Sequence, residues 1–206
     1  MIITVVGLGV VGGSFVKALK GQGHEVYGVD INEETLARAK ADGCIKEGFV
    51  NGDEIIKQSD MTIICLYPSL VLDYIKSHEF KKGSIITDAV GVKTHFLNEA
   101  MELLKDKDVE FVSGHPMAGR ENKGYLYASK EVFQGANYIL IQHEQNSKSA
   151  IAMMEQFVSN LGFHSVKIMS PQAHDEIISF TSQLPHVIAV SLIDSDNQKY
   201  DTGKYI

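Results

Sequence analysis

The sequence has few thiols. Its 206 residues include only two cysteines, Cys44 and Cys65, and their spacing of 21 residues matches no metal-binding or redox motif. Such sparse cysteine usage is typical of proteins from a reducing cytosol. We therefore expect a cytoplasmic protein.

Positive charge is also scarce. Lys and Arg number 19 against 26 Asp and Glu, which gives a net charge of −7, and no run of basic residues occurs. This balance argues against a nucleic-acid partner, because phosphate backbones are bound by cationic side chains. The N-terminus lacks the positive region and cleavage site of a signal peptide. No apolar run reaches the length needed to cross a bilayer, so we expect no membrane partner.

Motifs for metal and hydrolytic chemistry are missing from the sequence. His174 and His186 are 12 residues apart, which is not a metal-ligand spacing, and neither HExxH nor a Cys/His cluster occurs. A GxSxG nucleophile motif is absent as well. We expect neither a metal site nor a hydrolase.

The first half of the sequence alternates short β-branched runs with helical patterns. This alternation predicts an α/β fold with a doubly wound, mostly parallel Rossmann-type sheet. Two of the runs are almost continuously apolar, as in strands covered on both faces. Strands are predicted at 2–6, 25–29, 61–66, 84–87 and 109–112, and helices at 12–20, 33–41, 69–76 and 93–104.

The second half predicts a strand at 136–142, a helix at 148–161 and a strand at 165–169. Ser170 and Pro171 then have the composition of a helix start, with serine at the cap and proline in the first turn. This helix is expected to run to about residue 194, with a kink at Pro185. The change of pattern places a domain boundary near Met169.

A glycine motif follows the first predicted strand. It opens a helix, which is the context that a dinucleotide-binding GxGxxG requires. The first glycine allows a tight turn, the second lets the backbone approach a pyrophosphate, and the third lets helix and strand pack closely. The predicted cofactor-binding residues of this motif are Gly7, Leu8, Gly9, Val10, Val11 and Gly12.

Asp30 ends the second predicted strand, 18 residues after Gly12. A carboxylate at this point hydrogen-bonds the ribose hydroxyls of NAD and repels the 2′-phosphate of NADP. Ile31 and Asn32 supply no compensating cation, and Arg38 lies more than a turn farther along the helix. The sequence therefore predicts NAD as the cofactor.

Two further segments follow predicted strands at their carboxyl ends, where ligands bind in open α/β sheets. Tyr67 and Pro68 come after the strand at 61–66, on the expected nicotinamide side. His115 lies in the segment 113–120, and an imidazole suits removal of a hydroxyl proton during hydride transfer. The residues alone leave open whether His115 is a catalytic base or a loop histidine bonded to backbone.

The combined motifs resemble the prephenate dehydrogenase family, which includes arogenate and cyclohexadienyl dehydrogenases. They occur in the family's order over nearly the whole chain, and the GHPMAG and HD…LPH segments are the most specific. The matching segments are VVGLGVVGGSF at 5–15, TDAVGVK at 87–93, SGHPMAGR at 113–120, HD at 174–175 and TSQLPH at 181–186.

The resemblance implies an NAD-dependent oxidative decarboxylation of prephenate to 4-hydroxyphenylpyruvate, in tyrosine biosynthesis. His115 matches the catalytic histidine that accepts the proton of the ring hydroxyl. Lys93, His174, His186 and the position of Gly91 match the substrate pocket. The implied domains are an NAD-binding Rossmann-like domain, 1–169, and the beginning of a helical substrate and dimerisation domain, 170–206. A homodimer through these helices is implied as well.

The chain departs from the family pattern at two points. Gly91 stands where the family usually carries a serine that helps hold the substrate and the catalytic histidine. The family arginine that binds a substrate carboxylate belongs to a stretch beyond Ile206. Arogenate dehydrogenase, a β-hydroxyacid or imine reductase, and an NAD-binding module without catalysis remain as alternatives, although the lysine motif of the reductases was not found.

Overall fold

The computed structural model describes residues 1–119 and 122–195, so Arg120 and the tail 196–206 lie outside the described residues. The main sheet has six strands, all of them paired in parallel. Their order, with β1 in the centre, confirms the predicted Rossmann-type topology. In sheet order the strands are β3 (Glu47–Phe49), β2 (Glu25–Val29), β1 (Ile2–Val6), β4 (Met61–Ile64), β5 (Ser84–Asp88) and β6 (Val109–Phe111).

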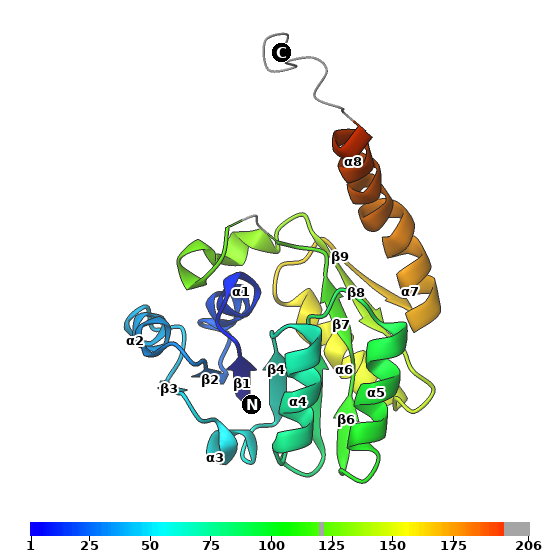
Figure 1. Cartoon of the computed structure of the whole chain (residues 1–206). Helices are drawn as coiled ribbons and strands as arrows, with labels where there is room; N and C mark the ends of the chain where they lie inside the picture. Colours follow the sequence, from blue (N-terminus) through cyan, green and yellow to red (C-terminus); the bar gives the residue numbers. More distant parts are fainter. Residues whose placement is uncertain (120–121, 196–206) are drawn as a thin grey trace.

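Helices cover both faces of this sheet (Figure 1). Successive strand residues point to opposite faces, so Ile3 and Val5 pack with Phe15 of α1 on one side, while Val6 packs with Val71 of α4 on the other. Burial of apolar residues on both faces makes these strands the core of the molecule. The helices are α1 (Val10–Leu19), α2 (Glu33–Ala41), α3 (Asp53–Ile56), α4 (Pro68–Ser77) and α5 (Thr94–Leu104).

A second, three-stranded sheet follows β6. Here β7 (Gly114–Pro116) runs antiparallel to β8 (Asn137–Ile141), and β9 (Ser165–Met169) runs parallel to β8 after the crossover helix α6 (Lys148–Ser159). The strands predicted at 136–142 and 165–169 therefore exist, but they lie outside the main sheet. Two 3₁₀ helices, Tyr125–Tyr127 and Lys130–Val132, connect β7 to β8.

The last described segment is a helix that projects from the body of the molecule (Figure 1). It consists of α7 (Pro171–Ile178), a π-helical segment (Ser179–Gln183) and α8 (Leu184–Ser195). The π-helical segment ends two residues before Pro185, whose ring and missing N–H disturb the preceding turn. The expected irregularity at Pro185 thus takes the form of a wider turn.

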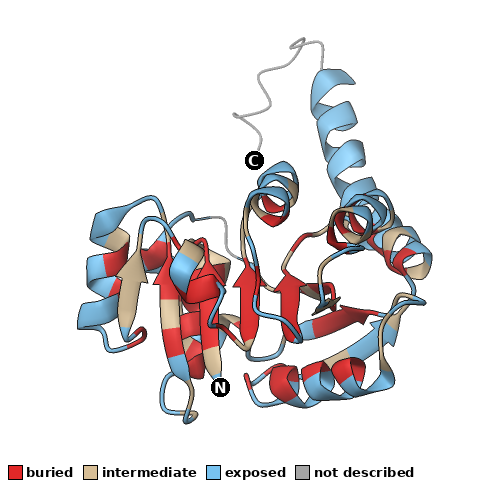
Figure 2. Ribbon diagram, turned by 90° about the horizontal axis from the view of Figure 1, so that it is seen from below, coloured by how far each residue is buried: buried red, intermediate tan, exposed pale blue. Residues whose placement is uncertain are grey.

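Nearly all of α8 is exposed (Figure 2). The combined helix Pro171–Ser195 has 25 residues and is, by length and composition alone, apolar enough to cross a membrane. The expectation that no segment reaches this length is therefore wrong. Its exposed large apolar residues are Ile177, Phe180, Leu184, Val187, Ile188, Val190, Leu192 and Ile193.

Some predicted boundaries also need correction. Helix α1 begins at Val10 rather than at residue 12, so the last three residues of the glycine motif lie in its first turn. The sequence analysis missed β3 and α3, which have only three and four residues. Elements this short are below the length at which hydrophobic periodicity can be detected.

Candidate active site

The glycine turn connects β1 to α1. Gly7 has a φ of 83°, and a Cβ there would lie 2.6 Å from the carbonyl oxygen of Cys65. A Cβ at Gly12 would lie 1.9 Å from the carbonyl oxygen of Gly7, so α1 approaches this turn as closely as backbone allows. A Cβ at Gly9 would meet no atom within 4 Å. Gly9 therefore faces the open space that a diphosphate group would need.

A cavity of about 470 Å³ adjoins this turn. It lies at the carboxyl ends of β1 and β4, where the strand order reverses and where dinucleotides bind in such sheets. Tyr67 lines the cavity, whereas Pro68 occupies the first position of α4. Leu8 is buried below the turn. The lining residues are Gly7, Gly9, Val10, Val11, Asp30, Ile31, Cys65, Leu66, Tyr67, Leu70, Ala89, Asn122, Lys123 and Gly124.

The Asp30 carboxylate is held by two backbone donors. The amide of Leu8 donates to Oδ2 over 2.7 Å, and the amide of Asn32 donates to Oδ1 over 2.9 Å. Each oxygen retains a lone pair for a further donor such as a ribose hydroxyl. The Arg38 guanidinium is paired with Glu34 at 2.9 Å. The residues present therefore fit the dinucleotide predicted from the sequence.

His115 lies on β7, close to the loop that follows β5. Ala89 lines the cavity, and a Cβ at Gly91, two residues later, would lie 3.5 Å from Nε2 of His115. On its other side, Nδ1 of His115 lies 2.8 Å from Nε2 of His174. Nδ1 of His174 lies 2.8 Å from the Asp175 carboxylate. Within the described residues, Nε2 of His115 has no hydrogen-bond partner.

The Lys93 side chain is completely buried. Its ammonium group donates to the Asp88 carboxylate at 2.7 Å, to the Ser113 hydroxyl at 2.8 Å and to the Gly114 carbonyl at 2.7 Å. Burial lowers the pKa of Lys93, and the Asp88 carboxylate opposes this effect. Because Gly114 precedes His115, these bonds fix the strand that carries the imidazole to the end of β5.

Three substrate-pocket predictions are revised by these positions. Lys93 and His174 have no exposed surface, so neither can contact a substrate directly in this structure. His186 lies on exposed α8, twelve residues and therefore about 18 Å along the helix from His174. Of the predicted substrate-contacting residues, only Gly91 lies next to an accessible atom of His115.

Burial is the largest influence on His115. Together with the positive charge of Lys93 and the neighbouring His174, it lowers the pKa of His115 to about 4, against a smaller opposing effect of Asp175. The imidazole is therefore neutral at physiological pH. A neutral imidazole with a free nitrogen can accept a proton from a hydroxyl group.

Several polar residues of this cluster had no role predicted from the sequence. Asp88 ends β5, Ser113 precedes β7, and Asp175 follows His174. The sequence contains a feature that could have pointed to each of them as a site residue: Asp88 and Ser113 follow predicted strands, and Asp175 belongs to the HD segment. Lys123 and Asn122 of the cavity lining were also missed, since they lie in a loop without a motif.

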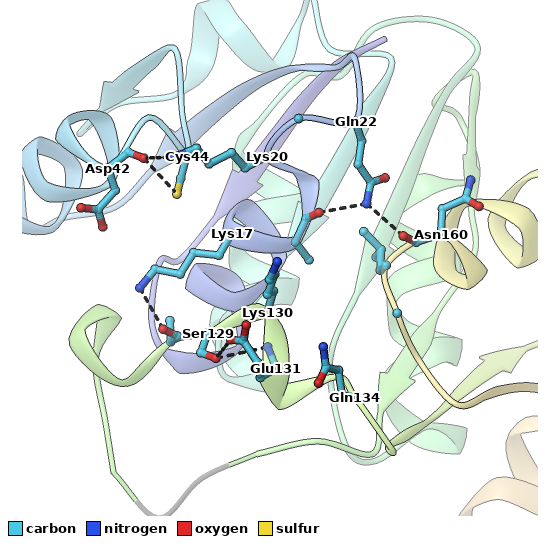
Figure 3. Close-up of a pocket in the computed structure, with 15 residues that line it drawn as sticks. Lys17, Lys20, Gln22, Asp42, Cys44, Ser129, Lys130, Glu131, Gln134 and Asn160 are labelled. Carbon is cyan, nitrogen blue, oxygen red and sulfur yellow. Dashed lines mark hydrogen bonds between the residues drawn. The ribbon is translucent and has the colours of Figure 1, made fainter.

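A larger cavity, of about 800 Å³, lies at the other end of α1 (Figure 3). Two of its three lysines are bonded to backbone: Lys17 donates to the Ala128 carbonyl and Lys20 to the Asp42 carbonyl. The Gln22 amide joins the carbonyls of Ala18 and Asn160. These contacts hold the end of α1 against neighbouring loops. Across residues 1–119 and 122–195, no group of side chains could hold a metal ion.

Comparison with known proteins identifies the fold and the family. Residues 15–167 match the family model described as "Prephenate dehydrogenase, nucleotide-binding domain". A prephenate dehydrogenase of Bacillus subtilis (strain 168) is 30% identical over 199 residues, which cover 93% of this chain and 52% of the relative. The chain thus spans about half the length of this curated relative.

Two solved structures are similar over most of the chain. The prephenate dehydrogenase of Aquifex aeolicus, in complex with hydroxyphenyl propionate and NAD⁺, has a TM-score of 0.84 and 28% identity, covering 94% of this chain and 68% of that one. A Synechocystis arogenate dehydrogenase has a TM-score of 0.87 and 26% identity, covering 98% and 71%. The family match decides against the β-hydroxyacid and imine reductase alternative. The chain belongs to the prephenate dehydrogenase family.

Proposed function

We propose that this protein catalyses the NAD-dependent oxidative decarboxylation of prephenate to 4-hydroxyphenylpyruvate, a step towards tyrosine. The observation that carries the proposal is the position of His115. Its Nε2 is free of intramolecular hydrogen bonds among the described residues and lies 3.5 Å from the Cβ position of Gly91, two residues after Ala89 of the dinucleotide cavity. A base in this place can act on a hydroxyl whose carbon faces the nicotinamide.

In the proposed reaction, Nε2 of His115 accepts the proton of the ring hydroxyl. Bound NAD would supply the acceptor for the hydride that leaves the ring carbon bearing this hydroxyl. The ring carboxylate leaves as carbon dioxide, and the electron pair of the broken carbon–carbon bond completes the aromatic ring. Lys93 and its partners hold β7 in place, so the imidazole is positioned before substrate arrives.

NAD is the proposed cofactor, bound by the glycine turn and Asp30. The space in front of Gly9 and the free lone pairs of the Asp30 carboxylate support it. The relative from Aquifex aeolicus carries NAD⁺ according to its description. Arogenate is the second candidate substrate, favoured by the likeness to the Synechocystis arogenate dehydrogenase. A module that binds NAD without catalysis is the third candidate.

We further propose a cytoplasmic protein with two domains, 1–169 and a helical region that begins at residue 170, and a homodimer through that region. The exposed apolar residues of α8 support this proposal, because a surface of this kind is normally covered by other protein. Light scattering at increasing concentration tests for the dimer. A monomer at every concentration would contradict self-association through this helix.

The test of the activity is direct. The chain is incubated with NAD and either prephenate or arogenate, in single-turnover conditions, while the absorbance of reduced nicotinamide is followed. Formation of NADH with prephenate supports the main proposal, and formation with arogenate alone supports the second. NAD binding in a calorimeter without NADH formation would indicate the non-catalytic module.

A further inference from the structure

Three side chains form a continuous line behind the reactive nitrogen of His115. Nδ1 of His115 lies 2.8 Å from Nε2 of His174, and Nδ1 of His174 lies 2.8 Å from Oδ1 of Asp175. The two rings are 5.1 Å apart between centroids and inclined by 58°. His174 is fully buried, and both of its ring nitrogens are used in this line.

We propose that Asp175 and His174 are positioning residues, which hold His115 in the tautomer with its proton on Nδ1 and thereby keep Nε2 available as the base. The inference deepens the proposed function and rests on it for its catalytic consequence. The tautomer itself is a property of the protein without substrate. It can therefore be tested separately.

The direction of the hydrogen bonds follows from Asp175. Its carboxylate accepts the backbone amides of Lys93 at 2.9 Å and of Thr94 at 2.8 Å, at the start of α5. Burial raises the pKa of Asp175, but the hydrogen bonds from Thr94, His174 and Lys93 outweigh this and lower it to about 2. Asp175 is therefore ionised at neutral pH and can only accept hydrogen bonds.

The Asp175 acceptor determines the direction of the other two hydrogen bonds in the line. His174 must donate from Nδ1 to Asp175, since the opposite tautomer would place a lone pair against a carboxylate. Burial lowers the pKa of His174, with a further contribution from the charge of Lys93, against the opposing effect of the hydrogen bond to Asp175. The net shift is downward, so the ring is neutral at pH 7 and its Nε2 is an acceptor. His115 must then donate from Nδ1, which leaves the lone pair on Nε2. The charged or titratable groups that affect His115 are Lys93, His174 and Asp175.

A purely structural role for the pair makes a different prediction. The hydrogen bonds that the Lys93 and Thr94 amides donate to Asp175 attach α7 to the start of α5, and this attachment needs no particular tautomer of His115. The bond between His174 and His115 is separate from it. Two substitutions of His174, one that keeps an acceptor for His115 and one that removes it, therefore distinguish the two roles. Only a positioning role predicts that the tautomer of His115 differs between them.

The experiment is nitrogen-15 NMR of the histidine rings in the chain as it exists, at pH 7. Wild-type His115 is expected to carry its proton on Nδ1, while the exposed His164, whose ring has no hydrogen-bond partner among the described residues, serves as the reference for an unconstrained ring. His174→Gln, whose amide oxygen can accept from His115, should retain this tautomer. His174→Phe, similar in size but without an acceptor, should move the His115 proton towards Nε2.

The effect of the same variants on catalysis is measured in parallel with the NMR spectra. His174→Phe should lower the single-turnover rate with prephenate by roughly 10–100-fold, as does the loss of a group that orients a metal-binding histidine in other proteins, with partial rescue in His174→Gln. NAD affinity should not change. An Nε2–H tautomer in wild-type His115 would overturn the proposal, even if the Phe variant fails to fold. A folded Phe variant with an unchanged tautomer would overturn it as well. Failure of the wild type to oxidise prephenate would refute the proposed function alone.

Discussion

The two sides of the cleft are constructed differently. The dinucleotide side is centred on consecutive residues 7–12, where glycines and backbone groups shape the turn, together with one carboxylate, Asp30. The histidine side joins side chains from three distant segments, at 88–93, 113–115 and 174–175, most of them buried. A local turn thus makes one half, and the docking of α7 against α5 completes the other. Substitutions on the dinucleotide side should therefore change NAD affinity, whereas substitutions on the histidine side should change the reaction rate.

The largest difference between the effect on reaction rate and the effect on NAD affinity is expected for His115→Asn. Asn keeps a polar side chain but removes the proton acceptor, so the single-turnover rate with prephenate should fall by about 10²–10⁴-fold, the usual contribution of a positioned general base. NAD affinity, measured by calorimetry, should stay the same because the glycine turn is intact. A variant with wild-type turnover would exclude His115 as the base.

The same histidine gives a pH prediction. Because the pKa of His115 is lowered to about 4, the rate should stay level from neutral pH down to about 5 and fall as the pH drops through 4. The unfolded chain binds this proton near the usual value of 6.5, so the folded state loses stability as the pH falls from about 6.5 towards 4. Urea unfolding at pH 7.5 and pH 5 measures this. His115→Asn should show a smaller loss over the same window.

On the dinucleotide side, the double change Asp30→Ser with Ile31→Arg should reverse the preference for NAD. It removes the acceptor for the ribose hydroxyls and adds a cation for a 2′-phosphate. Loss of a hydrogen bond to a charged group predicts about 10–100-fold weaker NAD binding. Calorimetric titration of both cofactors tests this, and equal affinities in the unmodified chain would contradict the assigned role of Asp30.

Gly12 and Gly9 lie in the same turn, so substitution of each by alanine gives a matched comparison. Gly12→Ala should destabilise the fold by roughly 1–3 kcal/mol or more, since the added Cβ would lie 1.9 Å from the Gly7 oxygen. Gly9→Ala adds the same atom to open space, so it should leave stability unchanged and weaken NAD binding. Thermal unfolding and calorimetry of both variants measure the two effects. Equal stability losses would show that Gly9 is also packed against the fold.

The smallest effect is expected for Gly91→Ser. The backbone has room for the side chain, because its Cβ would lie at an ordinary contact distance of 3.5 Å from Nε2 of His115. A hydroxyl donating to Nε2 favours the neutral ring and should lower the pKa of His115 further. NMR titration of His115 measures this shift. A raised pKa would show that the hydroxyl points elsewhere.

Much of the dinucleotide side was predictable because its information is local. Gly7, Gly12 and Asp30 follow strands that the β-branched runs at 2–6 and 25–29 indicate, and both turn and carboxylate lie where these strands end. The histidine side was predictable only in part. His115 was identified by its position after a strand and by resemblance, but His174 was assigned to substrate although it is buried behind His115.

The sequence by itself determined the alternating order of strands and helices, the cofactor turn and the carboxylate at Asp30, because each depends on neighbouring residues and on periodicity. Only the tertiary structure decided which polar groups face the cleft. Lys93, His174 and Asp175 lie far apart along the chain, and their burial depends on how β5, β7 and α7 pack together. Burial and contact between distant segments set both the pKa and the hydrogen-bond partners of His115, and neither is encoded in any single stretch of residues.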